Sequence, residues 1–308
     1  MRLQDWFQRT TAHWAAYSKY EILESEIMRY IVPTVDATVN IYDPLKIADE
    51  IVVDALNIGI QCVRESPDEV KITEDILAFA AKYGLLGFMT ALPTTPDFTS
   101  YEAVYLPKNP VIKHETMGKD VFIGLFFPPE REERLKQFRE NRQKVLGGDW
   151  GNGIDMLWVN KDDAKVNVAF RGSPEAKRRT FERGYAEPWL WLRNQFRDWA
   201  SLFCSAYFYY DEENETMREL HRRSIEAFGG VAPHYTVVLE ENKPQIKWDF
   251  HSLLQTIHIM LSFALADEAQ PLRLCKECST VYYATDKRSQ FCSPECKNRY
   301  GVRQSRKK

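Results

Sequence analysis

The chain has 308 residues, of which 44% are hydrophobic and 28% are charged, which is typical of a soluble globular protein with room for two domains. It shows no internal repeat, low-complexity tract, secretory signal or apolar run long enough to cross a bilayer, so we expect a cytoplasmic protein that is not bound to membranes. The net charge is −3, but residues 271–308 hold ten Lys/Arg against three Asp/Glu, so a basic tail (+7) follows an acidic body (−10).

The first part of the chain is predicted to be helical. Hydrophobic residues recur at helical spacing in three segments, residues 1–31, 44–63 and 73–83. In the first segment the pattern includes Trp6 and Trp14. Thr73 is the expected N-cap of the third helix, and Gly84 is its expected left-handed stop.

The middle of the chain favours strands. Expected strands cover residues 104–106, 121–127, 154–160 and 165–170, and the last two form a predicted hairpin. A charged helix is expected at residues 130–145. The glycine-rich segment 147–153 that follows lacks the spacing of a P-loop or of a dinucleotide fingerprint, so a loop is favoured over a phosphate cradle.

The rest of the body is predicted to return to helices. Long helices rich in aromatic residues are expected over residues 173–228, then a hairpin (234–240 with 245–250) and an apolar helix (251–266). The aromatic residues are more typical of a core than of a ligand pocket. The six histidines are scattered, and no nucleophile has a nearby base, so we predict no enzyme. We therefore expect an α+β fold, with a mostly helical body and antiparallel hairpins, over residues 1–270.

Residues 271–308, which we call the four-cysteine module, contain the most informative pattern. The spacing Cys275-x2-Cys278-x13-Cys292-x3-Cys296 is typical of one metal site. Four thiolates suit a tetrahedral zinc ion, and because the protein fills every position the expected Zn²⁺ is structural. So short a segment has little apolar surface, and metal binding would supply its missing stability. Cys62 and Cys204 lie in apolar, helix-like stretches and are expected to be buried thiols.

The local pattern predicts how the module folds. Residues 272–274 and 281–283 are expected strands on either side of a tight turn between the first two cysteines. Ser293 is a good N-cap, Pro294 suits the first helical position and Glu295 favours the first turn. Cys292 should therefore precede a helix whose first turn contains Cys296.

A basic stretch follows the last cysteine. Six of the twelve residues from 297 to 308 are Lys or Arg, and none is acidic. The residues expected to contact nucleic acid are Lys297, Arg299, Arg303, Arg306 and Lys307, with Lys287 and Arg288 from the preceding loop. Two alternatives remain open: a solvated tail or one docked on the acidic body, and a tail that binds another kind of partner.

These residues resemble the bacterial CGNR zinc fingers. The shared features are the paired cysteines of the turn, the aromatic strand at 281–283, and the helix that carries Cys296-Lys297-Asn298-Arg299, with Lys in place of the family's Gly. The segment 81–87 and the apolar helix before the module also resemble parts of related bacterial proteins. The resemblance implies a treble-clef-like module that binds DNA, and a body that senses a ligand or signal.

The sequence therefore predicts a zinc-binding, DNA-binding transcriptional regulator. The alternative is a structural or protein-interaction zinc module on a body with an unidentified activity. The sequence leaves open the DNA site, the choice between DNA and RNA, a small-molecule effector, the oligomeric state and the role of residues 1–270.

Overall fold

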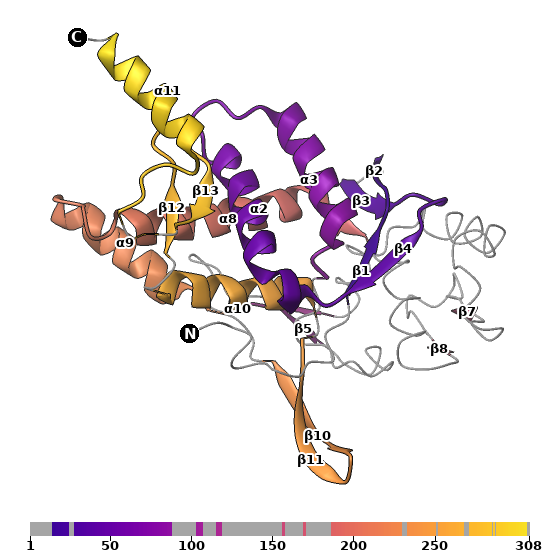
Figure 1. The fold of residues 1–308 in the computed structure, drawn as a ribbon. Coiled ribbons are helices and arrows are strands. Elements are labelled where there is room, and N and C mark those ends of the chain that lie inside the picture. The colour runs from indigo at the N-terminus through magenta and orange to yellow at the C-terminus, as the bar shows by residue number, and fades with distance from the viewer. Residues whose placement is uncertain are drawn as a thin grey trace.

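Helices and antiparallel strands alternate along the chain (Figure 1). The structure is a computed structural model that describes residues 14–24, 28–87, 103–106, 115–118, 156–157, 169–170, 186–229, 233–250, 252–267, 271–284, 286 and 288–306. Every strand pair in these residues is antiparallel, so the predicted α+β class is confirmed there. The predicted strand 121–127, helix 130–145 and glycine-rich segment 147–153 lie outside the described residues.

The region near the N-terminus consists of strands, so the helix predicted over residues 1–31 is wrong wherever the structure describes it. The strands are β1 (Trp14–Tyr17), β2 (Tyr20–Glu24), β3 (Arg29–Pro33) and β4 (Val39–Tyr42). β1 pairs with β4, and β2 pairs with β3, which also pairs with β9 (Glu187–Pro188). A spacing of eight residues, as between Trp6 and Trp14, fits the period of a strand as well as that of a helix. Pairing with distant segments decides between the two.

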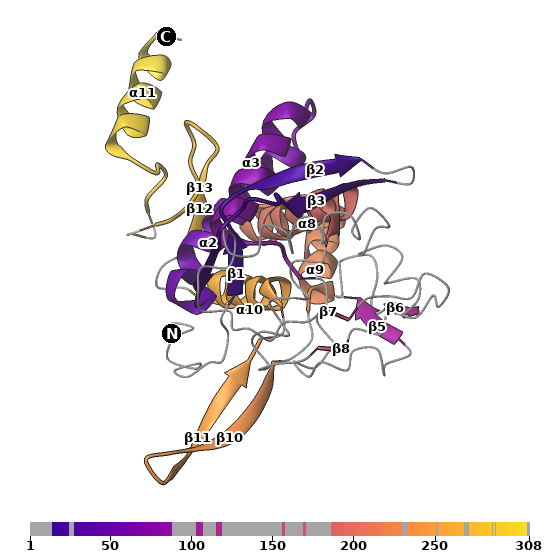
Figure 2. The same ribbon diagram turned by 90° about the vertical axis from the view of Figure 1, so that its right-hand side faces the viewer.

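Four helices pack together to form the core. They are α2 (Ala48–Cys62), which continues the 3-10 helix η1 (Pro44–Ile47), α3 (Glu69–Tyr83), α8 (Trp189–Phe208) and α10 (Leu253–Ala266). α2 contacts each of the other three (Figures 1 and 2). Buried aromatic residues of α8, among them Phe196 and Trp199, fill the space between them, as the aromatic pattern predicted.

Two predicted helix boundaries differ from the structure. α3 begins earlier than predicted because the side chain of Asp68 accepts a hydrogen bond from the backbone N–H of Lys71 and so caps the helix. Thr73, the predicted cap, lies inside α3, where its hydroxyl donates to the carbonyl of Glu69. In the predicted helical stretch 173–228, residues 187–188 form strand β9 and not helix, and α8 is followed by a separate helix, α9 (Glu215–Ala227).

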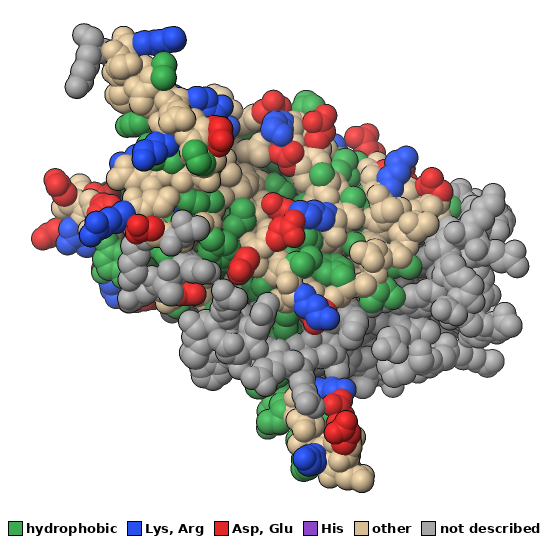
Figure 3. Space-filling view, in the orientation of Figure 1, with side chains coloured by type: hydrophobic (Ala, Val, Ile, Leu, Met, Phe, Trp, Pro, Cys, Tyr) green, Lys and Arg blue, Asp and Glu red, His purple; other side chains and the backbone are tan. Residues whose placement is uncertain are grey.

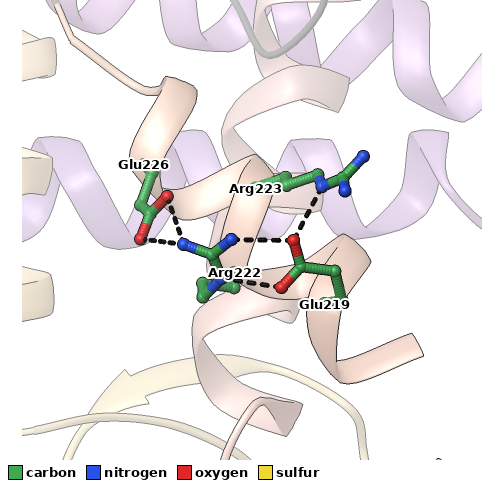
Figure 4. A network of polar contacts seen from close by, with 4 residues as sticks. All are labelled: Glu219, Arg222, Arg223 and Glu226. Carbon is green, nitrogen blue, oxygen red and sulfur yellow. Dashed lines mark hydrogen bonds and ion pairs between the residues drawn. The ribbon is translucent and has the colours of Figure 1, made fainter. Parts of the chain in front are cut away.

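α9 lies on the surface and carries a network of ion pairs. The guanidinium of Arg222 pairs with the carboxylates of Glu219 and Glu226, each at 2.7 Å, and Arg223 also pairs with Glu219 (Figure 4). Hydrogen bonds from the two arginines lower the pKa of Glu219 to about 2. Because these groups are exposed, the network contributes little to stability.

The loop of residues 84–87 after α3 has a backbone that favours glycine. Gly84 has φ +88° and ends the helix, as predicted, and Gly87 has φ +63°. A Cβ added at Gly87 would lie 2.5 Å from the ring of Trp14, so no larger residue fits there. The indole N–H of Trp14 donates to the carbonyl of Leu85 at 3.0 Å and holds the loop against β1.

A buried carboxylate holds the same loop from the other side. Glu187 of β9 is 0% exposed, and its carboxylate accepts hydrogen bonds from the backbone N–H of Leu86 at 3.0 Å and of Gly87 at 2.6 Å. The backbone N–H of Leu254, in the first turn of α10, donates to the carbonyl of Leu86 at 2.8 Å. The loop therefore links α3, β9 and α10 through buried polar contacts.

The predicted hairpin near residue 240 is confirmed. β10 (His234–Glu240) pairs with β11 (Lys243–Asp249) through a two-residue turn in which Glu241 and Asn242 have φ +50° and +62°. This hairpin projects from the body in both ribbon views (Figures 1 and 2).

Shorter strands occupy two other predicted regions. β5 (Ala103–Leu106) overlaps the predicted strand 104–106 and pairs with β6 (Glu115–Gly118), where no strand was predicted. β7 (Met156–Leu157) pairs with β8 (Ala169–Phe170) inside the hairpin predicted over residues 154–170. Among the described residues, every helix is too short or too polar to cross a membrane.

Candidate metal centre

The four-cysteine module folds as its local pattern predicted. β12 (Leu272–Leu274) pairs with β13 (Val281–Tyr283), and α11 (Pro294–Ser305) follows. The hydroxyl of Ser293 accepts a hydrogen bond from the backbone N–H of Cys296 at 3.3 Å, and Pro294 occupies the first turn. The cap and the proline start the helix at a point that directs Cys296 toward the turn between the two strands.

The module brings the four predicted cysteines together. The sulfur atoms of Cys275, Cys278, Cys292 and Cys296 all lie within 4.8 Å of one another. The Sγ of Cys292 is 3.6 Å from the Sγ of Cys278 and 3.6 Å from the Sγ of Cys296. Four sulfurs at ~2.3 Å around one tetrahedral ion would be about 3.8 Å apart. The cluster therefore has the size that one metal ion requires.

Backbone hydrogen bonds shape the turn that carries the first two cysteines. The backbone N–H of Cys275 donates to the carbonyl of Thr280, and that of Ser279 donates to the carbonyl of Cys275, both at 2.9 Å. Ser279 has φ +56°, which reverses the chain after the second thiol. The backbone N–H of Lys276 donates to the carbonyl of Gln290 at 3.0 Å and joins the turn to the segment before Cys292.

The surroundings favour thiolates at two of the four positions. Burial opposes ionisation of Cys275, but backbone hydrogen bonds with Cys278, Cys292 and Glu277 prevail and lower its pKa to about 6. The guanidinium of Arg299 donates to the Sγ of Cys296 at 3.1 Å and lowers the pKa of that thiol. Such thiols are ready metal ligands, because the thiolate is the form that binds.

The pKa of Cys292 shows what a bound cation would contribute. Burial and the neighbouring sulfurs raise the pKa of Cys292, because several thiolates so close together repel one another. A divalent cation supplies the opposite charge that lets all four ionise. Cys275 and Cys296 are buried, Cys278 is half-buried and Cys292 is exposed, so the cluster lies at the surface of the module.

The two cysteines outside the module lie apart from this cluster. Cys62 is buried near the end of α2, and Cys204 is half-buried in α8. Burial raises the pKa of both thiols, as expected for cysteines that serve as small apolar residues.

The strands of the module pack directly on the body. The side chain of Asn57, on α2, donates to the carbonyl of Val281 at 3.1 Å and accepts from the N–H of Val281 at 2.7 Å. Leu272 and Val281 also belong to the main hydrophobic core. The boundary predicted at residue 270 stays a prediction, but the strands of the module and the body share one core.

We expect Asn57→Ala to weaken the attachment of the module. The substitution leaves the backbone N–H and carbonyl of Val281 without their partners, which should lower the free energy of unfolding by about 2 kcal/mol. Urea unfolding of the metal-loaded protein measures this change. Asn40→Ala, at an exposed position on β4, is the control. Equal unfolding midpoints for Asn57→Ala and the control would show that the contact has no such role.

The predicted nucleic-acid contacts mostly lie on α11. This helix projects from the body, and basic side chains occur along it (Figures 1, 2 and 3). Lys297, Arg299, Arg303 and Arg306 are all exposed, and Cys296 is the one buried residue of the helix. Residues 297–306 are therefore not docked on the acidic body. Arg288 is exposed in the preceding loop, whereas Lys287 and Lys307 lie outside the described residues.

Two of the arginines also contact the cluster of four cysteines or the turn beside it. Besides the contact of Arg299 with Cys296, the guanidinium of Arg303 pairs with the carboxylate of Glu277 at 2.9 Å. Glu277 lies between the first two cysteines of the turn. The sequence analysis did not foresee these contacts, although the helical spacing of Arg299 and Arg303 from Cys296 is compatible with them.

Comparison of the chain with protein-family models, curated proteins and solved structures found no match. The resemblance to the CGNR zinc fingers, with its treble-clef-like fold, therefore stays a prediction. What the structure shows is four clustered cysteines, between a hairpin packed on the body and a basic helix.

Proposed function

We propose that Cys275, Cys278, Cys292 and Cys296 bind one structural Zn²⁺ ion, and that α11 then contacts DNA. Four cysteine thiolates form a donor set that zinc binds in tetrahedral geometry, and they leave no coordination position for a reacting water. The ion would hold the hairpin and the start of α11 together in a treble-clef-like arrangement. Its role would be structural, with the chemistry of recognition left to the helix.

The exposure of the basic helix is the observation that carries the DNA proposal. Lys297, Arg299, Arg303 and Arg306 occupy a helix that is exposed beyond its first turn. A projecting helix fits the major groove, and guanidinium groups bind phosphates and base edges with directed hydrogen bonds. The contacts of Arg299 with Cys296 and of Arg303 with Glu277 would orient part of this surface before DNA arrives. Together these features support a DNA-binding regulator of transcription.

Salt dependence tests this proposal directly. The metal-loaded full chain is titrated into a fluorescent duplex of mixed sequence, and binding is followed by anisotropy. If about four phosphates are contacted, the affinity should fall on the order of a hundredfold between 50 and 200 mM salt. A flat salt response, or no binding at 50 mM salt, would overturn the proposal. A single-stranded RNA of equal length tests the choice of nucleic acid.

A charge substitution on α11 should weaken this binding without loss of metal. We expect Arg306→Ala to reduce the affinity for DNA by roughly three- to tenfold and to make the salt dependence less steep. Arg64→Ala removes an exposed charge from the chain after α2 and is the matched control. Equal affinities for Arg306→Ala and Arg64→Ala would show that α11 is not the contact surface.

A second function is favoured by the contact of the module with the body. Because Asn57 binds Val281 and the strands of the module join the main core, the metal would also stabilise the body. In a purely structural or protein-interaction module, metal removal would destabilise the whole chain and the arginine substitutions would leave nucleic-acid binding absent or unchanged. A ligand-sensing role of the body stays a prediction.

A further inference from the structure

One face of the β10–β11 hairpin consists of apolar residues. The register places Tyr235 opposite Trp248, Val237 opposite Ile246, and Leu239 opposite Pro244. Successive side chains of a strand alternate between its two faces, so these three cross-strand pairs share one side of the hairpin. Five of the six are exposed, namely Tyr235 (61%), Val237 (62%), Leu239 (76%), Ile246 (51%) and Pro244, and Trp248 is half-buried. We call these six residues the apolar hairpin face.

The opposite face of the hairpin is mostly polar. It includes Glu240, Lys243, Gln245 and Lys247, and the ammonium of Lys247 pairs with the carboxylate of Glu240 at 2.6 Å. In the space-filling view, hydrophobic side chains line one side of the projecting hairpin and acidic ones line the other (Figure 3). The hairpin is therefore amphipathic. This pattern is typical of antiparallel strands that pack one face on other protein and expose the other face to water.

The exposed apolar area is large for a projecting element. The side chains of Tyr235, Val237, Leu239 and Ile246 alone present on the order of 500 Å², near the upper end for the largest apolar patch of a monomer. A two-stranded ribbon is also marginally stable unless its hydrophobic face packs on something. Both considerations point to a covering partner.

We propose that a second copy of this chain covers the apolar hairpin face. Two such faces would pack against each other across a twofold axis, about 10 Å apart as in other stacked sheets. They would together bury about 1,000 Å², the lower limit for a specific interface. The hairpin projects by roughly 24 Å, given seven residues per strand at ~3.4 Å each, which leaves the two bodies clear of each other.

The order of residues along the face suits such a twofold packing. The aromatic pair Tyr235–Trp248 lies at the base of the hairpin, and the smaller Leu239 and Pro244 lie at its tip. In an antiparallel stack, the tip of one copy meets the aromatic base of the other, and Val237 and Ile246 meet their own copies at the axis. The face contains no charged residue, so its copy is not repelled, and the Glu240–Lys247 pair remains in water on the outer side.

The tip of the hairpin favours this partner over a lipid surface. Its turn carries Glu241 and Asn242, both exposed, and a carboxylate is costly to bring into an anionic or apolar membrane surface. The proposal does not depend on binding of nucleic acid by α11.

Sedimentation velocity of the metal-loaded full chain, without nucleic acid, tests the proposal. We expect a concentration-dependent dimer at micromolar protein, and Ile246→Lys should raise the dimer dissociation constant on the order of a hundredfold, because each dimer would bury two such charges. Gln245→Lys adds the same charge to the neighbouring residue on the opposite face and should leave the dimer intact. Val237→Lys is a second variant of the apolar face, and metal content and circular dichroism verify folding of each protein.

The proposal has clear opposing outcomes. A wild-type chain that stays monomeric up to about 100 μM would overturn the proposal by itself, because this concentration is far above the dissociation constant of a specific interface. A dimer that survives both Ile246→Lys and Val237→Lys would place the interface elsewhere. A monomer that floats with phosphatidylcholine vesicles, and loses this property in Ile246→Lys, would assign the face to a lipid surface instead.

Discussion

Replacing Cys275 by serine is expected to release the metal ion and to unfold the four-cysteine module. Cys275 is 1% exposed, and it donates from its backbone N–H to Thr280 and accepts at its carbonyl from Ser279, so it cannot move to let a serine or a water complete the site. Structural zinc in small modules contributes about 10–16 kcal/mol of apparent binding free energy, so loss of one ligand should cost at least ~5 kcal/mol.

Elemental analysis and limited proteolysis measure the two parts of this result. After dialysis against a chelator, the wild type should keep about one equivalent of zinc and Cys275→Ser should keep almost none. Proteolytic cleavage should then appear within residues 271–306. Cys204→Ser is the control, because that thiol is half-buried in α8, outside the cluster. Retention of a full equivalent of metal by Cys275→Ser would remove the basis of the proposed function.

The metal should also connect the module to the rest of the core. Val281 is 0% exposed and packs in the same hydrophobic cluster as the helices of the body. Once the cluster of thiols has lost its ion, β13 is held on the body by Asn57 and by this packing. Unfolding of Cys275→Ser should therefore begin at a lower urea concentration than unfolding of the wild type. If the substitution changes only the proteolytic pattern, the body folds independently of the module.

Replacing Glu187 by alanine is expected to have the second large effect, on stability. The carboxylate is 0% exposed and accepts hydrogen bonds from the backbone N–H groups of Leu86 and Gly87. Removing it leaves two buried donors unpaired and opens a cavity beside the backbone of Leu86 and Gly87. Hydrogen bonds to charged groups contribute about 1.5–3 kcal/mol each, so we expect a loss of roughly 4 kcal/mol in the free energy of unfolding.

Glu187→Gln separates the charge from the shape of this side chain. Glutamine fills the same space but offers one carbonyl oxygen in place of two carboxylate oxygens. Glu187→Gln should therefore lower the free energy of unfolding by about half as much as Glu187→Ala. Urea unfolding of metal-loaded protein, followed by tryptophan fluorescence, measures both variants. A loss below about 1 kcal/mol for Glu187→Ala would mean that the 84–87 loop is held chiefly by its other contacts.

The body shows where sequence patterns were insufficient. Aliphatic and aromatic residues in 14–33 fit a helical period, yet this segment forms strands. β1 pairs with β4, and β3 pairs with β9, which lies more than 150 residues later in the chain than β3. Local propensity cannot anticipate such pairing, because the hydrogen-bond partners lie in distant segments. The same holds for Asn57, which contacts a strand 224 residues later, and for Glu187. By contrast, Gly84 could be predicted because the left-handed end of a helix is a local requirement.

The sequence by itself determined the cluster of four cysteines, since their spacing, the Ser293 cap and Pro294 act within a few turns of chain and need no distant partner. The period-2 pattern of residues 234–249 likewise specified the hairpin and its apolar face. Only the tertiary structure decided that the N-terminal segment is sheet, that the module shares the core of the body and that α11 projects into solvent. Each of these depends on which surfaces meet in space. The free energy of burying one surface against another depends on both segments, so the sequence of either segment alone does not predict it.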